Sequence, residues 1–100
     1  MIENYVSELV SKLELSDKVK VRTIALLNQI LKNNVMKEKE LKGVIGAALY
    51  IVSLYEGERR TLKEIVNVIG ISEPTISKRF KEIIEILADE NSQIRIIKLE

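Results

Sequence analysis

The middle of the chain carries a segment that is apolar on almost every side of a helix, and no other feature limits the possible folds as strongly. The segment covers residues 44–55 and reads VIGAALYIVSLY. A helix that is apolar all round has to be enclosed by other elements, and this one is too short to cross a bilayer. Its small residues let neighbouring helix axes approach closely, although each glycine costs roughly 1 kcal/mol against alanine. We therefore expect a buried helix over about residues 40–55 at the centre of the domain.

Helical patterns flank this segment on both sides, and only one proline and four glycines interrupt the 100 residues. Apolar residues recur at three- and four-residue spacing, as on one face of an amphipathic helix, over residues 2–13, 16–34, 61–70 and 72–87. The sequence therefore predicts a single all-α domain of five helices over residues 1–90. A tail over residues 91–100 would be either a short strand or a disordered end.

Capping signals mark where several of these helices begin and end. Ser16 is a suitable N-cap for the second helix, and Thr61 with Glu64 fits a capping box at the start of the fourth. Gly70 is suited to end the fourth helix because glycine tolerates a positive φ. Pro74 fits the first turn of the fifth helix, where the N–H that proline lacks would have no partner.

Residues 61–87 read as a short helix, a tight glycine turn and a longer helix. This is the organisation of a helix-turn-helix, whose second helix enters the major groove of DNA. The second helix carries hydroxyl and cationic side chains; arginine can fork onto guanine, and lysine suits phosphate. The interpretation requires these side chains to point outwards. Neutralisation of Lys78 and Arg79 by carboxylates would contradict it.

The distribution of charge supports this interpretation better than the total does. The net charge is only +1, from 16 basic and 15 acidic residues. Residues 59–81, however, contain six basic and two acidic residues, and residues 82–90 contain four acidic residues and no basic one. A local basic patch of this size can supply the salt-dependent phosphate contribution to DNA affinity.

The chain lacks the residues that most often carry out catalysis or bind metal ions. The chain contains no cysteine and no histidine, which removes thiolate nucleophiles, the commonest general base and the commonest metal ligands. The sequence also shows no nucleophile–base pair and no phosphate-binding glycine loop. We expect neither an enzyme nor a bound metal or cofactor.

Two runs of residues resemble a known family. Residues 46–51 (GAALYI) and 56–65 (EGERRTLKEI) look like the central part of a cyclin repeat in archaeal transcription factor B and eukaryotic transcription factor IIB. Residues 70–83 (GISEPTISKRFKEI) resemble the helix-turn-helix of that family's second, C-terminal repeat. The resemblance extends more loosely over residues 2–41. It implies that nearly the whole chain is one five-helix cyclin-like repeat.

The resemblance also implies a function. In the family, the second repeat reads double-stranded promoter DNA just upstream of the TATA box, and the two repeats clamp the TATA-binding protein on bent DNA. RNA polymerase is a further partner, whereas no membrane and no small-molecule substrate is expected. The location would be the cytoplasm at the nucleoid, or the nucleus in a eukaryote. The positions that match the recognition helix and its basic surroundings are Thr75, Ser77, Lys78, Arg79, Lys81, Arg60 and Lys63.

Several features depart from the family and from the general motif. No cysteine is present to build the zinc ribbon that recruits polymerase, and the first repeat is absent, so the chain would be either a fragment of a longer factor or a stand-alone relative. Pro74 stands where a branched residue is common. Counting on from Gly70, the ninth position is Arg79, where a helix-turn-helix usually has an apolar residue.

Two alternatives remain at this point. A cyclin-like fold can act as a protein-interaction module without binding DNA, holding its partner in the groove beside the central helix, and the acidic residues 82–90 would then serve a basic partner. A winged-helix repressor would need residues 93–100 to pair in a β-hairpin, and the sequence offers at most one strand.

Overall fold

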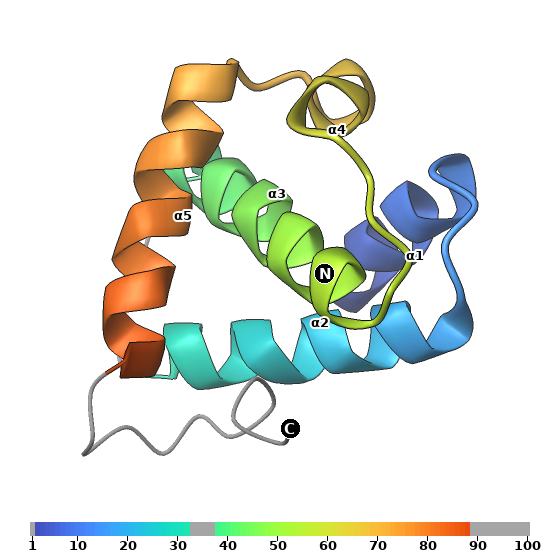
Figure 1. Ribbon diagram of the computed structural model, residues 1–100, viewed down its shortest axis with the longest axis horizontal. Coiled ribbons are helices and arrows are strands. Elements are labelled where there is room, and N and C mark those ends of the chain that lie inside the picture. The colour runs from blue at the N-terminus through green and yellow to red at the C-terminus, as the bar shows by residue number, and fades with distance from the viewer. Residues whose placement is uncertain (1, 33–37, 89–100) are drawn as a thin grey trace.

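The computed structural model of the protein describes residues 2–32 and 38–88, and within these ranges the chain forms five helices (Figure 1). They are α1 (Ile2–Lys12), α2 (Asp17–Leu31), α3 (Glu38–Tyr55), α4 (Leu62–Ile69) and α5 (Glu73–Ala88). No strand occurs in the described part of the chain, so the all-α prediction with five helices is confirmed. The expected domain boundary at residue 90, and the strand that the winged-helix alternative needs, lie outside the described residues.

The central helix is longer than expected at its N-terminal end. It begins at Glu38 rather than near Glu40. Residues 38–42, which precede the apolar segment, are glutamate, lysine and leucine, and all three are good helix formers. They therefore continue the helix on the N-terminal side of the apolar segment. At the other junction, α2 ends at Leu31 with Lys32 as its C-cap.

The predicted capping residues occupy the predicted positions. The Val19 N–H donates to the Ser16 hydroxyl at 3.3 Å at the start of α2. The Glu64 N–H donates to Thr61 Oγ1, and the Thr61 N–H donates back to the Glu64 carboxylate, which completes the capping box of α4. Gly70 ends that helix with φ 79°.

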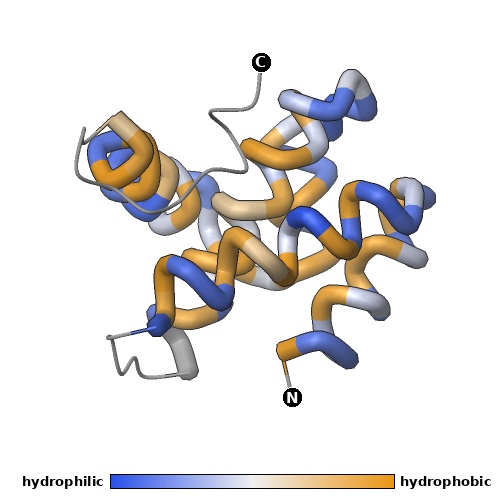
Figure 2. The backbone as a smooth tube through the Cα atoms, turned by 90° about the horizontal axis from the view of Figure 1, so that it is seen from below, coloured by the Kyte–Doolittle hydropathy of each residue, from blue (hydrophilic) through white to orange (hydrophobic). Residues whose placement is uncertain are grey.

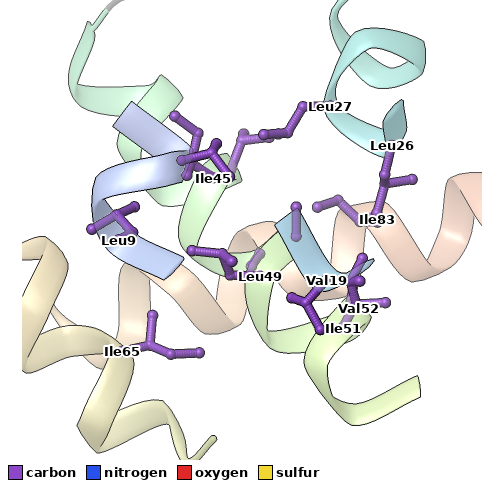
Figure 3. Packing of buried hydrophobic residues seen from close by; sticks show 14 of the residues in the cluster. Leu9, Val19, Leu26, Leu27, Ile45, Leu49, Ile51, Val52, Ile65 and Ile83 are labelled. Carbon is purple, nitrogen blue, oxygen red and sulfur yellow. The ribbon is translucent and has the colours of Figure 1, made fainter. Parts of the chain in front are cut away.

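Helix α3 runs through the middle of the molecule and packs against α2, α4 and α5 (Figure 1). Every residue over 43–49 is buried. Figure 3 shows side chains from the four surrounding helices gathered about Ile45 and Leu49, both of which belong to the one core cluster. The surrounding helices alternate between hydrophobic and hydrophilic residues along their length (Figure 2). Among the described residues, no helix is long and apolar enough to span a membrane.

Two glycines of α3 set the distance to α5. A Cβ placed on Gly46 would lie 3.0 Å from Ile76 Cδ1 and 3.4 Å from Ile69 Cδ1. A Cβ on Gly43, one turn earlier, would lie 3.2 Å from both the Thr75 methyl group and Arg79 Cγ. The separations from Ile76, Thr75 and Arg79, all on α5, are shorter than ordinary van der Waals contact. The expectation that small residues allow close approach to the central helix therefore holds at the α3–α5 contact.

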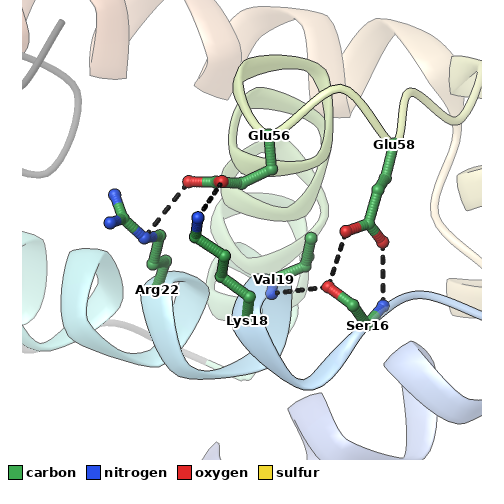
Figure 4. A network of polar contacts seen from close by, with 6 residues as sticks. All are labelled: Ser16, Lys18, Val19, Arg22, Glu56 and Glu58. Carbon is green, nitrogen blue, oxygen red and sulfur yellow. Dashed lines mark hydrogen bonds and ion pairs between the residues drawn. The ribbon is translucent and has the colours of Figure 1, made fainter.

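The segment between α3 and α4 is tied to the start of α2 by carboxylates (Figure 4). Glu56, whose side chain is 9% exposed, forms ion pairs with Lys18 at 3.4 Å and Arg22 Nε at 3.1 Å. Glu58 accepts hydrogen bonds from the Ser16 N–H at 2.9 Å and the Ser16 hydroxyl at 2.6 Å. These contacts hold the segment that leads into α4 against the N-terminus of α2.

Candidate nucleic-acid interface

Helices α4 and α5 form the predicted helix-turn-helix. Figure 1 views α4 close to end-on while α5 runs across the view, so the two helices cross steeply. The turn between them starts at Gly70, whose left-handed backbone lets the chain reverse within a few residues. Ile69 and Ile76, on either side of the turn, are buried. Because both lie against Gly46, the helix-turn-helix is seated on the central helix.

A hydroxyl pair caps the start of α5. The Thr75 N–H donates to the Ser72 hydroxyl at 3.4 Å, and the hydroxyl groups of Ser72 and Thr75 are 2.9 Å apart. Pro74 lies in the first turn, as expected. The Thr75 methyl group faces Gly43, so this residue is half-buried rather than fully outward.

The outer face of α5 carries exposed lysines. Lys78 and Lys81 are exposed, and Ser77 beside them is half-buried. Lys63 is exposed on α4. Neither Lys78 nor Lys81 forms an ion pair within the described ranges. A lysine that is exposed and unpaired is free to contact a phosphate group.

Arg79 does not share this free surface, and its predicted outward orientation is wrong. The side chain is 18% exposed. Its Nη1 donates to the Glu82 carboxylate at 2.9 Å, and its Nη2 lies 3.8 Å from a Glu40 carboxylate oxygen of α3. Adjacent helical positions point about 100° apart, and Lys78 points outwards while Arg79 lies against α3. Of the two cations whose neutralisation would have counted against the interpretation, Arg79 is neutralised and Lys78 forms no ion pair with any described residue.

Arg60 is also occupied within the fold, so the prediction that it contributes to a basic surface needs correction. Its Nε donates to the Leu13 carbonyl at 2.9 Å, and Nη2 donates to the Glu14 carbonyl at 3.1 Å. Nη1 donates to the carbonyls of Glu58 at 3.2 Å and Arg59 at 3.1 Å. The guanidinium group therefore satisfies carbonyls at the end of α1 and in the segment before α4, and it is not free to bind a phosphate.

Two carboxylates near this corner have lowered pKa values. Hydrogen bonds from the Ser16 hydroxyl and N–H lower the pKa of Glu58, with smaller contributions from Arg60 and Lys18. Hydrogen bonds from the Thr61 N–H and hydroxyl lower the pKa of Glu64. Both side chains therefore stay charged at neutral pH. Within the described ranges, no three acidic side chains converge in a way that could hold a metal ion.

A family model described as "Transcription factor TFIIB repeat" matches residues 2–86, which is most of the chain.

The chain belongs to the TFIIB repeat family.

Named relatives agree with this assignment. The chain is 40% identical over 82 residues to "Transcription initiation factor IIB" of Pyrococcus furiosus, 38% over 88 residues to that of Aeropyrum pernix and 42% over 80 residues to that of Methanopyrus kandleri. These alignments cover 82%, 88% and 80% of this chain, but only 27%, 27% and 26% of the relatives. The TFIIB repeat described here thus spans about a quarter of the relatives' length. The predicted family resemblance and the five-helix cyclin-like fold are confirmed.

One feature of the sequence of this TFIIB repeat indicates that the Arg79 side chain lies against the fold rather than outwards. The ninth position after Gly70 is usually apolar in a helix-turn-helix because it faces the supporting helix. Arg79 occupies that position, and its aliphatic stem lies on Gly43, where no side chain competes for space. Arginine can bury its stem while its charged end finds a carboxylate. Its carboxylate partners are Glu40 and Glu82, and the sequence did not predict these ion pairs.

Proposed function

We propose that this TFIIB repeat is a promoter DNA-binding module of a general transcription initiation factor. The first half of α5 enters the major groove of double-stranded DNA upstream of a TATA box, and the TATA-binding protein shares the site. The observation that carries this proposal is the exposure of Lys78 and Lys81 on the outer face of a helix that follows a tight turn.

The residues on that face suit phosphate contacts more than base contacts. Lys78 and Lys81 on α5, together with Lys63 on α4, provide the cations. Thr75 and Ser77 provide hydroxyl groups that can contact either base type. We therefore propose that Lys78, Lys81, Lys63, Thr75 and Ser77 form the DNA-facing set, without Arg60 and Arg79. Affinity for duplex DNA should then depend strongly on salt.

The assignment within the family is also a proposal. Residues 70–83 resemble the second repeat, so we infer that the chain corresponds to this repeat rather than the first. The relatives carry the name transcription initiation factor, and the chain spans 27% of the Pyrococcus furiosus relative. Binding of the TATA-binding protein, contact with RNA polymerase and action at the nucleoid follow as expectations for the module. We expect this repeat, tested on its own, to bind DNA weakly, because the family resemblance implies that two repeats together form the clamp.

Fluorescence anisotropy with a labelled TATA-containing duplex tests the proposal. The logarithm of the affinity should fall linearly with the logarithm of salt concentration. Replacing Lys78 and Lys81 by glutamine should weaken binding and reduce the magnitude of that slope by about 2. Lys12→Gln with Lys20→Gln removes the same charge from α1 and α2 and should leave the slope nearly unchanged. The proposal fails if no binding is detected at low salt with or without the TATA-binding protein.

A protein-interaction module without DNA binding is the second candidate, favoured by the acidic residues on the same helix. Glu82 and Glu85 are exposed on α5, one turn beyond the lysines. A basic partner could use this surface. If the lysine variant captures a protein partner as well as the wild type does, and neither binds duplex DNA, this candidate replaces the first.

A further inference from the structure

Arg79 links the two helices that meet beneath the recognition surface. Its guanidinium group contacts Glu82 one turn further along α5 and Glu40 near the start of α3. The Nε atom is buried and has no hydrogen-bond partner within the described residues. The Nε atom of Arg79 is buried, and its two Nη atoms contact carboxylates of α5 and α3. The guanidinium group therefore lies between the two helices.

The backbone of α3 is adapted to this side chain. Gly43 has no Cβ, and the position where one would stand is 3.2 Å from Arg79 Cγ and from the Thr75 methyl group. A Cβ at residue 43 would require both neighbours to shift by a few tenths of an ångström. The contact therefore has an apolar part, where Gly43 accepts the stem of Arg79, and a charged part, where Glu40 and Glu82 accept its end.

We propose that Arg79 is a positioning residue that fixes the first half of α5 on the first half of α3, and that it does not read a base. The proposal rests on the proposed function, since it names what aligns the recognition helix with DNA. Apolar contacts between Gly46 and Ile76 and between the rings of Tyr50 and Phe80 hold α5 against α3. Arg79 adds a polar contact to Glu40 near the start of α3, and this contact helps to fix the direction in which Lys78 projects.

Substitution of Glu82, an acidic partner of Arg79, distinguishes a positioning role from base recognition. If Arg79 read a base, loss of the Glu82 carboxylate would release the guanidinium group and strengthen binding. If Arg79 positions α5, loss of that carboxylate weakens binding even though it removes a negative charge near DNA. Glu85→Gln is the matched control, because Glu85 is an exposed glutamate on the same helix with no ion pair to Arg79.

The first arm of the experiment measures dissociation constants on a matched duplex and on duplexes with single base-pair changes. We expect Arg79→Ala to weaken binding about three- to tenfold on every duplex, with the ratios between duplexes unchanged. Arg79→Lys should restore most of the loss because it keeps the charge and the stem. Glu82→Gln should weaken binding, add nothing when combined with Arg79→Ala, and differ from Glu85→Gln, which should leave binding unchanged or tighter.

The second arm needs no DNA and therefore separates this proposal from the proposed function. In the wild type, NMR should show a nuclear Overhauser effect between the Gly43 Hα protons and the Thr75 methyl group. Arg79→Ala should weaken it while the effect between the rings of Tyr50 and Phe80, whose centroids are 5.5 Å apart, persists. The persisting ring contact also shows that the variant is folded, and Glu82→Gln, which keeps the stem on Gly43, provides a second variant.

The outcomes test two proposals separately: that α5 binds DNA, and that Arg79 positions α5. Loss of discrimination at one base pair in Arg79→Ala, or equal tightening by Glu82→Gln and Glu85→Gln, overturns the positioning role. An unchanged Gly43–Thr75 effect in Arg79→Ala overturns it as well. Absence of duplex binding by the wild type removes the proposed function, and the NMR arm then still decides whether Arg79 positions α5.

Discussion

Two helices end in a residue with left-handed backbone and the same hydrogen-bond pattern, but one of these residues is a glutamate and the other is a glycine. After α1, Glu14 has φ 56°, and the Leu15 N–H donates to the Val10 carbonyl. After α3, Gly57 has φ 78°, and the Glu58 N–H donates to a carbonyl five residues earlier. Both are Schellman ends, in which glycine is the usual residue. A residue with a Cβ is strained in this conformation.

This difference predicts opposite effects for two substitutions. Glu14→Gly should raise the free energy of unfolding by about 0.5–1 kcal/mol, because it removes backbone strain and keeps the carbonyl that accepts from Arg60. Gly57→Ala should lower the free energy of unfolding by about 1 kcal/mol, and a Cβ there would meet no atom within 4 Å, so the cost is conformational. Urea denaturation of the two variants measures both changes. Equal signs for the two would contradict this explanation.

Contacts within a few residues could be predicted from the sequence, whereas contacts between distant segments could not. The caps at Ser16, Thr61 and Gly70 could be predicted because a cap and the groups that it satisfies lie within four residues. The distant partners of Arg60 at the end of α1 and of Arg79 on α3 could not be predicted, because nothing local in the sequence shows that these elements meet. Basic residues in a helix-turn-helix are expected to face outwards, and nothing local distinguishes Arg79 from Lys78 except its place in the motif.

At the scale of elements, the segment between α3 and α4 joins the corner between α1 and α2. Arg60 satisfies carbonyls at the end of α1, and Glu58 satisfies Ser16 at the start of α2. Helix ends leave backbone groups without intrahelical partners. Side chains of the segment before α4 thus provide hydrogen-bond partners for backbone groups at the end of α1 and the start of α2. These contacts fix the position of α4 relative to α1 and α2.

Removal of the Arg60 guanidinium group should loosen this corner. Arg60→Ala should lower the free energy of unfolding by about 2 kcal/mol, since a charged donor to several partly buried carbonyls is lost. Arg59→Ala is the control, because Arg59 is an exposed neighbour and its loss should change stability by less than about 0.5 kcal/mol. Thermal or urea unfolding compares the two. Similar losses in both variants would show that the carbonyl contacts contribute little.

The lowered pKa of Glu58 predicts how stability depends on pH. A carboxyl group whose pKa is lower in the folded state stabilises the fold above its ordinary pKa of 4.5, and this contribution is lost as pH falls through the folded pKa. The urea midpoint should therefore fall when pH is lowered from about 6 to about 3, and Glu58→Gln should reduce that fall.

A matched glutamine variant checks that the effect belongs to this site. Glu85→Gln alters an exposed glutamate on α5, away from Ser16, and should keep the pH response of the wild type. If Glu58→Gln and Glu85→Gln respond to pH in the same way, the hydrogen bonds from Ser16 do not account for the dependence.

At the scale of the whole molecule, the central helix organises both the core and the candidate site. The apolar segment predicted a buried helix, and the pattern of small residues predicted close neighbours. The partner at that close contact is α5, which carries the outward lysines. Which helix would meet the glycines could not be predicted, because periodicity identifies a buried face but not the element that covers it. The resemblance to the TFIIB family implied a five-helix repeat, and the fold agrees with that expectation.

The proposal that the first half of α5 faces duplex DNA can be tested by an NMR titration of the labelled chain with a TATA-containing duplex at low salt, alone and with the TATA-binding protein. We expect the largest changes in amide shift on the turn after Gly70 and on α5 as far as Lys81, with α1 unaffected, and we expect added salt to reverse them. Changes centred on α1 and α2, or on the acidic end of α5, would contradict it, as would no change under either condition.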